Sequence, residues 1–367
     1  MALSTIPTRA LTEQGINFRN LIINGDMSIA QRGTSFTGQT SGAYYLDRFK
    51  TDMSSLGTWT ITQSTDVPTG QGFEKSMKFD CTTADASPSA GDFLYLNQPI
   101  EGHNTQSFKF GTSNAESLTL SFWVKSNKTG TYVVRFYDID NQRVQSQSYT
   151  ISSASTWEKK TITISGDTVS GPNFDNGYAF AVNWCLGAGT TYTSGTLNTS
   201  WNSVTNANQF VGQVNLADST SNEWYITGVQ LEVGTTASDF EFLPHDVNLR
   251  RCQRYFENHT ASGSCQIAHA FGSSSARCYF QYRTKKRTTP TITLATAGNG
   301  DGEISFLTKG GAYVGTIGTH SSLNVAIDRF NVNVAGGYSS TGWAEGDAIF
   351  FYVNGNNYVV WEADAEL

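Results

Sequence analysis

The sequence has few charged residues and no long apolar run. Charged residues make up 15% of the 367 residues, and 24 Lys and Arg stand against 31 Asp and Glu, which gives a formal net charge of −7. Binding to a phosphate backbone gains its affinity from Lys and Arg, so this balance predicts no nucleic-acid partner. A membrane-spanning helix needs about 20 apolar residues. Neither such a run nor the apolar core of a signal peptide is found in the sequence. We therefore expect that the protein does not insert into a membrane and that it assembles in a cytoplasm.

Closely spaced cysteines are missing too. The five cysteines are an odd number, and none stands in a CxxC pair. This pattern argues against a disulfide scaffold, and also against a zinc site, whose ligands usually come in close pairs. We expect buried free thiols at Cys81, Cys185, Cys252, Cys265 and Cys278.

Catalytic motifs are missing as well. None of the five histidines lies in an HExxH or HxH arrangement, or near a Ser in a GxSxG elbow. Asp138, Asp140 and Asn141 in YDIDNQR, and Asp301 and Glu303 in GNGDGE, have oxygen atoms suited to calcium. Asp and Asn are also ordinary turn formers, and we interpret both stretches as turns. We expect no enzyme, no metal and no cofactor.

One basic run, RTKKR at 283–287, stands out in this acidic chain. It is short and lacks the interleaved aromatic residues that stack nucleic-acid bases. We interpret it as a solvated turn or as a salt-bridge surface between subunits.

What the sequence does contain is typical of an all-β protein. Gly numbers 35, aromatic residues reach 13%, and short runs alternate between apolar and polar residues. In LTLSFWV (118–124), YVVRFYD (132–138) and YAFAVNW (178–184), every second residue is apolar, which indicates strands with one buried face. Such strands bury that face by pairing two sheets. We therefore predict a β-sandwich of the jelly-roll type over residues 20–245.

The alternation changes parity once within the last predicted strand of this sandwich. Trp224 and Ile226 lie at even positions, whereas Val229 and Leu231 lie at odd ones. One extra residue at Gly228 would let both halves face the same core, so we predict a β-bulge there.

After Pro244 the strand-like runs begin again, starting with RRCQRYFE at 250–257. We predict a smaller, second β-sandwich over residues 246–367, joined to the first by a short, stiff connection that lacks Gly and Ser. Residues 1–19 show no clear period, and we interpret them as an arm that docks on a partner. In the run 349–353 the apolar residues lie on both parities, which predicts a surface covered by symmetric association.

Two loops place aromatic residues among Gly, Ser, Thr and Asn. Tyr192 and Trp201 lie in the stretch 187–209, and Tyr338 and Trp343 lie in 336–347. Aromatic faces stack on sugar rings while amide and hydroxyl groups bond the sugar hydroxyls, so these four residues are candidates for glycan binding. Alternatively, they fold back and anchor their loops.

Five strings, in order, span nearly the whole chain: NLIINGDMSIAQRG (20–33), YLDRF (45–49), QLEVGTTASDFEFLP (230–244), CQRYF (252–256) and ADAEL (363–367). Through them the chain resembles tail fibres and related receptor-binding virion proteins of tailed bacteriophages, chiefly of marine and cyanobacterial phages. The resemblance implies a homotrimer in which a virion-attached jelly roll precedes a distal, receptor-facing domain, and a host-surface polysaccharide as ligand. It supplies no catalytic residue.

The expected function is therefore that of a tail fibre, assembled in the host cytoplasm. Residues 1–19 would attach it to a tail adaptor or nozzle, and the C-terminal loops would recognise host glycan. Because the arm is short and no heptad-bearing shaft follows, attachment to the capsid remains open. The alternative is a capsid decoration or head-fibre protein with a purely structural role.

Overall fold

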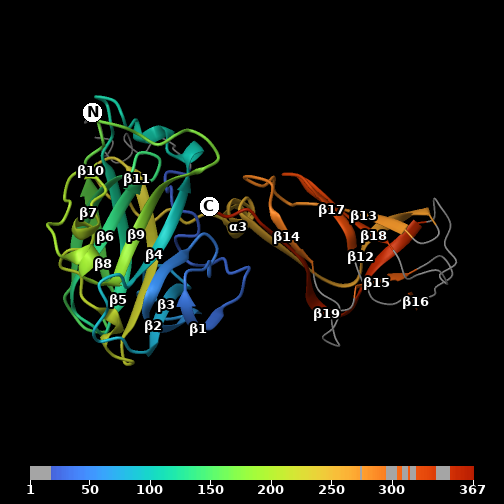
Figure 1. Cartoon of the computed structure of the whole chain (residues 1–367), viewed down its shortest axis with the longest axis horizontal. Helices are drawn as coiled ribbons and strands as arrows, with labels where there is room; N and C mark the ends of the chain where they lie inside the picture. The colour runs from blue at the N-terminus through green and yellow to red at the C-terminus, as the bar shows by residue number, and fades with distance from the viewer. Residues whose placement is uncertain (1–17, 273–274, 295–303, 308–312, 315–319, 336–347) are drawn as a thin grey trace, which may run out of the picture. The chain divides into compact units, whose positions relative to one another are not determined.

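The computed structural model describes residues 18–272, 275–294, 304–307, 313–314, 320–335 and 348–367, and not the side chains of 260–266, 271–276, 304–323, 333–335 and 348–360. The chain divides into two compact units, Met1–Pro244 and His245–Leu367. The sequence analysis placed this boundary one residue later. Both units consist of antiparallel strands (Figure 1).

The first unit contains an 11-stranded sheet. Its strands are β1 Ser35–Ser41, β2 Lys50–Ser64, β3 Ser76–Thr83, β4 Phe93–Glu101, β5 Leu118–Ser126, β6 Gly130–Asp138, β7 Arg143–Ile151, β8 Glu158–Ile164, β9 Tyr178–Ala188, β10 Asn202–Ser203 and β11 Glu223–Val233. Hydrogen bonds join them in the order β10-β7-β6-β9-β4-β2-β3-β11-β5-β8, and β1 pairs with β2.

The long strand β2 belongs to both halves of this sheet. Its first part, Lys50–Ser55, pairs with β4, and its second part, Thr58–Ser64, pairs with β3. The backbone turns between them, where Ser55 has φ +53° and Gly57 has φ +70°. A side chain on Gly57 would meet the Thr83 carbonyl oxygen at 2.6 Å, so glycine satisfies both the space and the dihedral angle there.

The two halves of the sheet face each other as layers. Phe122 of β5 packs against Trp184 of β9 and Tyr149 of β7, with ring centroids 5.9 and 5.2 Å apart, although β5 is hydrogen-bonded to neither strand. One continuous apolar core fills the space between the layers. The prediction of an all-β protein with a jelly-roll-like sandwich is confirmed.

The segment 20–33 is held by buried amides. The Asn20 side chain donates to the Val229 carbonyl oxygen at 3.0 Å, and its oxygen accepts the Leu231 amide at 3.1 Å. The Asn24 side chain bonds both the amide and the carbonyl of Ile29, each at 2.9 Å. These contacts replace the ladder that a strand would make, because buried backbone groups need partners.

The predicted bulge in β11 is confirmed. Against β5, the register jumps between Thr227 and Gln230, so two residues of β11 stand opposite one of β5. Gly228 has φ +60°, and Trp224 and Leu231 both lie in the core, fully buried.

The second unit contains an 8-stranded antiparallel sheet. Its strands are β12 Phe256–Gly272, β13 Ser275–Gln281, β14 Thr291–Leu294, β15 Ile304–Leu307, β16 Tyr313–Val314, β17 His320–Val325, β18 Arg329–Ala335 and β19 Ala348–Asp364. β12 and β19 pair over most of their length. The side chains at 349–353, on which the expectation of a trimer depends, lie outside the described ones.

The strand-like interpretation of 250–257 is wrong for most of that run. Residues His245–Gln253 form the helix α3, and β12 begins only at Phe256. Asp246 lies in the first turn and Arg250 and Arg251 in the last. Charges of these signs interact favourably with the helix dipole at its two ends and so stabilise the helix.

Within the described parts of the chain, no helix is long and apolar enough to span a membrane.

The basic run 283–287 is not a solvated turn throughout. Lys286 is buried, and its ammonium group donates to Glu257 Oε2 at 2.7 Å and to the Gln253 carbonyl oxygen. Arg287 donates to the carbonyl oxygens of Ala365 and Glu366 at 2.9 and 2.7 Å. The run therefore ties α3, β12 and the C-terminal residues together.

We expect Gly228→Ala to destabilise the first unit more than Gly70→Ala. Both glycines have positive φ, a strain of about 1–2 kcal/mol for other residues. A methyl group at 228 would also lie 2.5 Å from the Phe73 ring and 3.0 Å from Trp123, whereas nothing lies within 4 Å at Gly70. Overpacking of this kind costs roughly 1–3 kcal/mol more.

Urea unfolding followed by tryptophan fluorescence measures both free energies of unfolding. Equal losses in the two variants would show that the bulge has room for a side chain, contrary to the geometry.

Candidate functional site

The candidate site lies on the face of β4, β9 and β6 that points away from the core. In these strands alternate residues are buried between the layers, which leaves Phe93 and Tyr95 of β4 and Arg135 and Tyr137 of β6 on the other face. The register sets Asn183 of β9 opposite Arg135. Because β9 runs between β4 and β6, the aromatic residues of β4 stand across one strand from Arg135.

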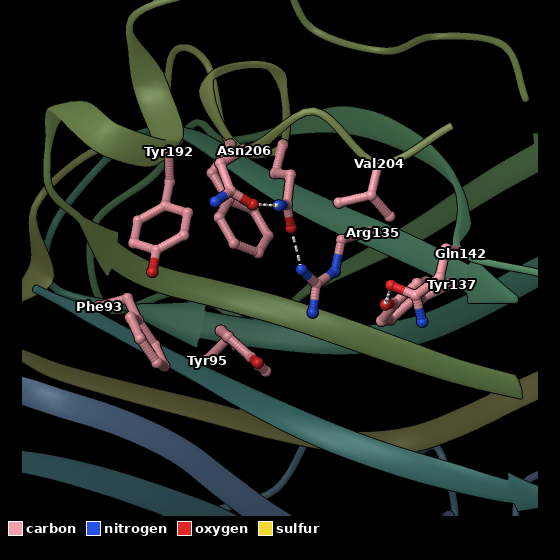
Figure 2. Close-up of a pocket in the computed structure, with 10 residues that line it drawn as sticks. Phe93, Tyr95, Arg135, Tyr137, Gln142, Tyr192, Val204 and Asn206 are labelled. Atoms are coloured by element: carbon pink, nitrogen blue, oxygen red, sulfur yellow. Dashed lines mark hydrogen bonds between the residues drawn. The ribbon is translucent and has the colours of Figure 1, made fainter. Parts of the chain in front are cut away.

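A long loop between β9 and β11, residues 189–215, folds over part of this face (Figure 2). It contains the short helix α2 Thr190–Thr193 and a 3₁₀ turn at Asn206–Asn208. The Phe210 amide donates to the Tyr192 carbonyl oxygen at 2.9 Å, and the Tyr192 ring packs edge-on against Phe93 with centroids 5.4 Å apart. Beneath the loop, Phe210 packs with Val133 and Cys185 in a small apolar cluster.

A pocket of about 240 Å³ opens between the strands and the loop. Figure 2 shows Phe93 and Tyr95 along one side, Tyr192 from the loop, and Arg135 extending between them and Tyr137. Ten residues line it: Phe93, Tyr95, Arg135, Tyr137, Gln142, Tyr192, Val204, Asn206, Gln209 and Phe210.

Arg135 is the central charge of the pocket. Its guanidinium carbon lies 4.9 Å from the ring centre of Tyr95, 5.1 Å from Tyr137 and 5.0 Å from Phe210, distances at which cation–π attraction operates. Nε donates to Asn183 Oδ1 at 2.9 Å, and Nη1 donates to Gln209 Oε1. The rings and two amide oxygens therefore fix the orientation of the guanidinium.

Burial keeps two tyrosines of this face, Tyr95 and Tyr178, in the neutral form. Burial raises the pKa of Tyr95, and the nearby charge of Arg135 opposes this rise without cancelling it. Burial likewise raises the pKa of Tyr178, whose hydroxyl is bonded to the Asn97 side chain at 3.0 Å. The Tyr137 hydroxyl donates to Gln142 Oε1 at 2.7 Å. The pocket thus combines ring faces, hydroxyls and amides around a single cation.

The four aromatic candidates from the sequence fall into three groups. Tyr192 lines the pocket. Trp201 is only 9% exposed, packs against Phe110 and Phe180 in the core, and donates its indole N–H to the Ser165 carbonyl oxygen at 2.8 Å. It anchors its loop and offers no open ring face. Tyr338 and Trp343 lie outside the described residues.

Sequence reasoning missed the residues that matter most here. Arg135, Tyr95 and Gln209 were not candidates, although the alternation of YVVRFYD does set Arg135 opposite the apolar face. An arginine within a predicted strand is the only local signal. That Tyr95 and Gln209 come beside it depends on the pairing of distant strands and on the loop, which the sequence does not reveal.

Where they are described, the candidate metal ligands close a turn and the cysteine thiols are buried. Asp138 accepts hydrogen bonds from the Asn141 backbone and side chain and closes the turn between β6 and β7. Among the described residues, no group of His, Cys, Asp and Glu could hold a metal ion. The four cysteines whose side chains are described are buried, and Cys81 and Cys185 among them are free thiols. Burial raises the pKa of Cys185.

Comparison with known proteins gives no family for the chain. No family model and no curated protein matches it. Three solved structures are similar in fold at low TM-scores. The first is the enzymatically active domain of tailspike protein 4 of bacteriophage CBA120 (TM-score 0.31, 15% identity, 59% of this chain and 22% of that chain). The match therefore covers less than a quarter of that tailspike domain.

The second is a putative sugar-binding protein from Bacteroides thetaiotaomicron (TM-score 0.32, 14% identity, 58% of this chain and 99% of that chain). The third is the family 11 carbohydrate-binding module of a cellulosomal cellulase from Clostridium thermocellum (TM-score 0.27, 10% identity, 55% and 98%). At such scores these likenesses carry no conclusion about function.

Trp201→Phe is expected to lower the free energy of unfolding by about 1–3 kcal/mol, because it removes a buried indole hydrogen bond and core volume. Tyr192→Phe, in the same loop, removes only a hydroxyl at a half-exposed position and should cost less than about 0.5 kcal/mol. Urea unfolding of both variants tests the assignment. An equal cost would contradict the distinction between a core anchor and a pocket residue.

Proposed function

We propose that the chain is a carbohydrate-binding virion protein of a tailed phage, and that the pocket between β4, β6, β9 and the loop 189–215 holds part of a host-surface glycan. The observation that carries this proposal is the lining of the pocket, in which aromatic rings surround fixed polar groups. The site proposed here belongs to the first unit. Recognition through Tyr338 and Trp343 in the second unit stays a prediction.

The chemistry of the lining suits a sugar. Phe93, Tyr95 and Tyr192 are half-buried, so their rings have surface left to pack against the apolar face of a sugar ring. Gln142 and Asn206 are exposed and carry both donors and acceptors for hydroxyl groups. Since drug-sized pockets measure roughly 300–1,000 Å³, the volume of about 240 Å³ favours one ring or a chain end as occupant.

We propose that the pocket binds a glycan and does not cleave it. None of the ten lining residues is Asp, Glu, His, Cys or Ser. General acid–base and nucleophilic catalysis mostly use such side chains, with Tyr as a less common choice, and hydrolysis of a glycosidic bond commonly uses a pair of carboxyl groups, which this lining lacks. The lining therefore supports retention of a glycan over its cleavage.

The place in the virion rests on the ordered strings that resemble tail-fibre proteins. We propose a homotrimeric tail fibre that docks through residues 1–19, with capsid decoration as the alternative. Phe18, the first described residue, donates its amide to Glu241 Oε1, and the Asn20 amide donates to Oε2, each at 3.0 Å. The contact anchors residue 18 beside residue 241, at the end of the first unit.

Tyr95→Ala and Tyr192→Ala should each weaken glycan binding by about 3- to 10-fold, because each removes a stacking surface worth about 0.5–1.5 kcal/mol. The measurement is binding of the full chain to an array of bacterial surface polysaccharides. Trp157→Ala is the matched control, since Trp157 is a half-buried aromatic residue immediately before β8, in the other layer. Unchanged binding in both pocket variants, or an equal loss in the control, would rule out this pocket.

Labelling the chain with gold-tagged antibody in intact particles should mark the tail. Label over the capsid would support decoration instead, and label on neither would reject the virion role.

A further inference from the structure

The charge of Arg135 is buried without a compensating carboxylate. The residue is 7% exposed, and its two hydrogen bonds go to amide oxygens of Asn183 and Gln209. Among the residues that the structure describes, no Asp or Glu lies within ion-pair distance of it. An unpaired buried charge is costly, and buried charges in proteins are normally paired.

The other layer offers a direct contrast in Lys125. Lys125 is also buried, at 8% exposure, and also lies among aromatic rings, with Nζ 4.3 Å from the centre of Tyr225 and 5.6 Å from that of Trp157. It differs in being paired with Asp66, which also accepts the Trp157 indole N–H at 2.9 Å. The same fold thus neutralises one aromatic-caged cation and leaves the other without an anion.

A chain of hydrogen bonds holds the guanidinium in place. Gln209, which accepts from Nη1, donates in turn to Asn206 Oδ1 at 2.9 Å, and Asn183 Oδ1 accepts from Nε. Figure 2 shows this chain of bonds running from the loop to Arg135. A guanidinium has five N–H donors and keeps its charge at any ordinary pH. Two of them donate to these amides, and the Tyr95 hydroxyl is a further hydrogen-bond partner, so donors remain for a ligand.

Neighbouring groups do not supply the missing negative charge. Tyr95 stays a neutral phenol because burial raises its pKa. Asp52 of β2 shares this face, since the Asn97 side chain donates to it at 2.7 Å, and it forms an ion pair with Lys50. Its backbone stands three strands from β6 in the sheet, roughly 14 Å away at about 4.8 Å per strand, and no ion pair joins its carboxylate to Arg135.

We propose that the pocket selects a sugar that carries a carboxylate, such as a uronic acid, and that Arg135 pairs with this carboxylate. The proposal rests on the glycan-binding function proposed above and specifies its ligand. Carboxylate and guanidinium form two parallel, charge-assisted hydrogen bonds, which use donors that the protein leaves over. The aromatic rings then contact the sugar ring, and one charged ring fills the small volume.

The sharpest test needs no variant. Calorimetric titration of the full chain with oligogalacturonate, oligoglucuronate and oligomannuronate is compared with titration of the methyl ester of each, which differs only in the charge of the carboxyl group. We expect at least one acid to bind, and its ester to bind about 10- to 100-fold more weakly. Binding of the acid should also weaken as salt increases, although less steeply than for an exposed pair.

Two variants assign the selectivity to the residue. Arg135→Met should bring the affinity for the acid down to that for the ester. Lys125→Met is the matched control, because it removes an aromatic-caged cation that already has a carboxylate partner, and it should leave the ratio unchanged. Arg135→Lys keeps the charge but not the fork geometry and should retain part of the preference even if Arg135→Met does not fold.

The outcomes separate this proposal from the one on which it rests. Equal binding of acid and ester, or binding only of neutral oligosaccharides, would overturn carboxylate selection while leaving glycan binding in place. Binding of none of the acids, together with no signal on the polysaccharide array, would overturn both.

Discussion

The strand β2 constrains the first unit more than any other element, because it is shared by both layers. Its first half aligns β4, and through β4 also β9 and β6, whereas its second half aligns β3, β11, β5 and β8. The turn at Gly57 between the halves lets a single hydrogen-bonded sheet fold over its own core. The pocket is a consequence, since β4, β9 and β6 form the layer whose outer face the loop 189–215 covers in part. A substitution at Gly57 would therefore disturb the pocket although Gly57 does not line it.

The alternation of strand residues explains both the stability of the layer and its chemistry. In β6 every second side chain enters the core, which obliges Arg135 to lie on the opposite face. There the loop buries it among rings and amides instead of leaving it in water. This arrangement costs stability, because a cation loses hydration without gaining an anion. If Arg135 had a structural role alone, an ion pair such as that between Lys125 and Asp66 would stabilise the fold better. The difference between these two sites is the physical reason to assign a ligand to one of them.

Local patterns predicted what depends on neighbours in sequence. The parity change between Trp224 and Leu231 located the bulge at Gly228, and alternation identified the buried faces of the long strands. The pattern failed at α3, where RRCQ has too few residues to separate a helix from a strand. It failed for Lys286 as well, because burial of a lysine depends on a distant Glu257. Tyr192 and Trp201 have the same kind of surroundings in sequence and opposite environments in space, so composition cannot distinguish a pocket residue from an anchor.

The five strings on which the expected resemblance depends and the residues of the pocket have different roles. Asn20 and Asn24 are buried, and their side chains bond backbone groups that no strand satisfies. Gln230, in another of these strings, is fully buried and bonds Glu232 and the segment that follows it. The pocket residues all lie outside these strings. The strings at 20–33 and 230–244 thus contribute to the framework of the first unit, whereas strand faces and a loop outside all five strings form the pocket. A resemblance carried by the strings accordingly predicts the architecture, and the ligand has to be inferred from residues such as Arg135 that the resemblance does not include.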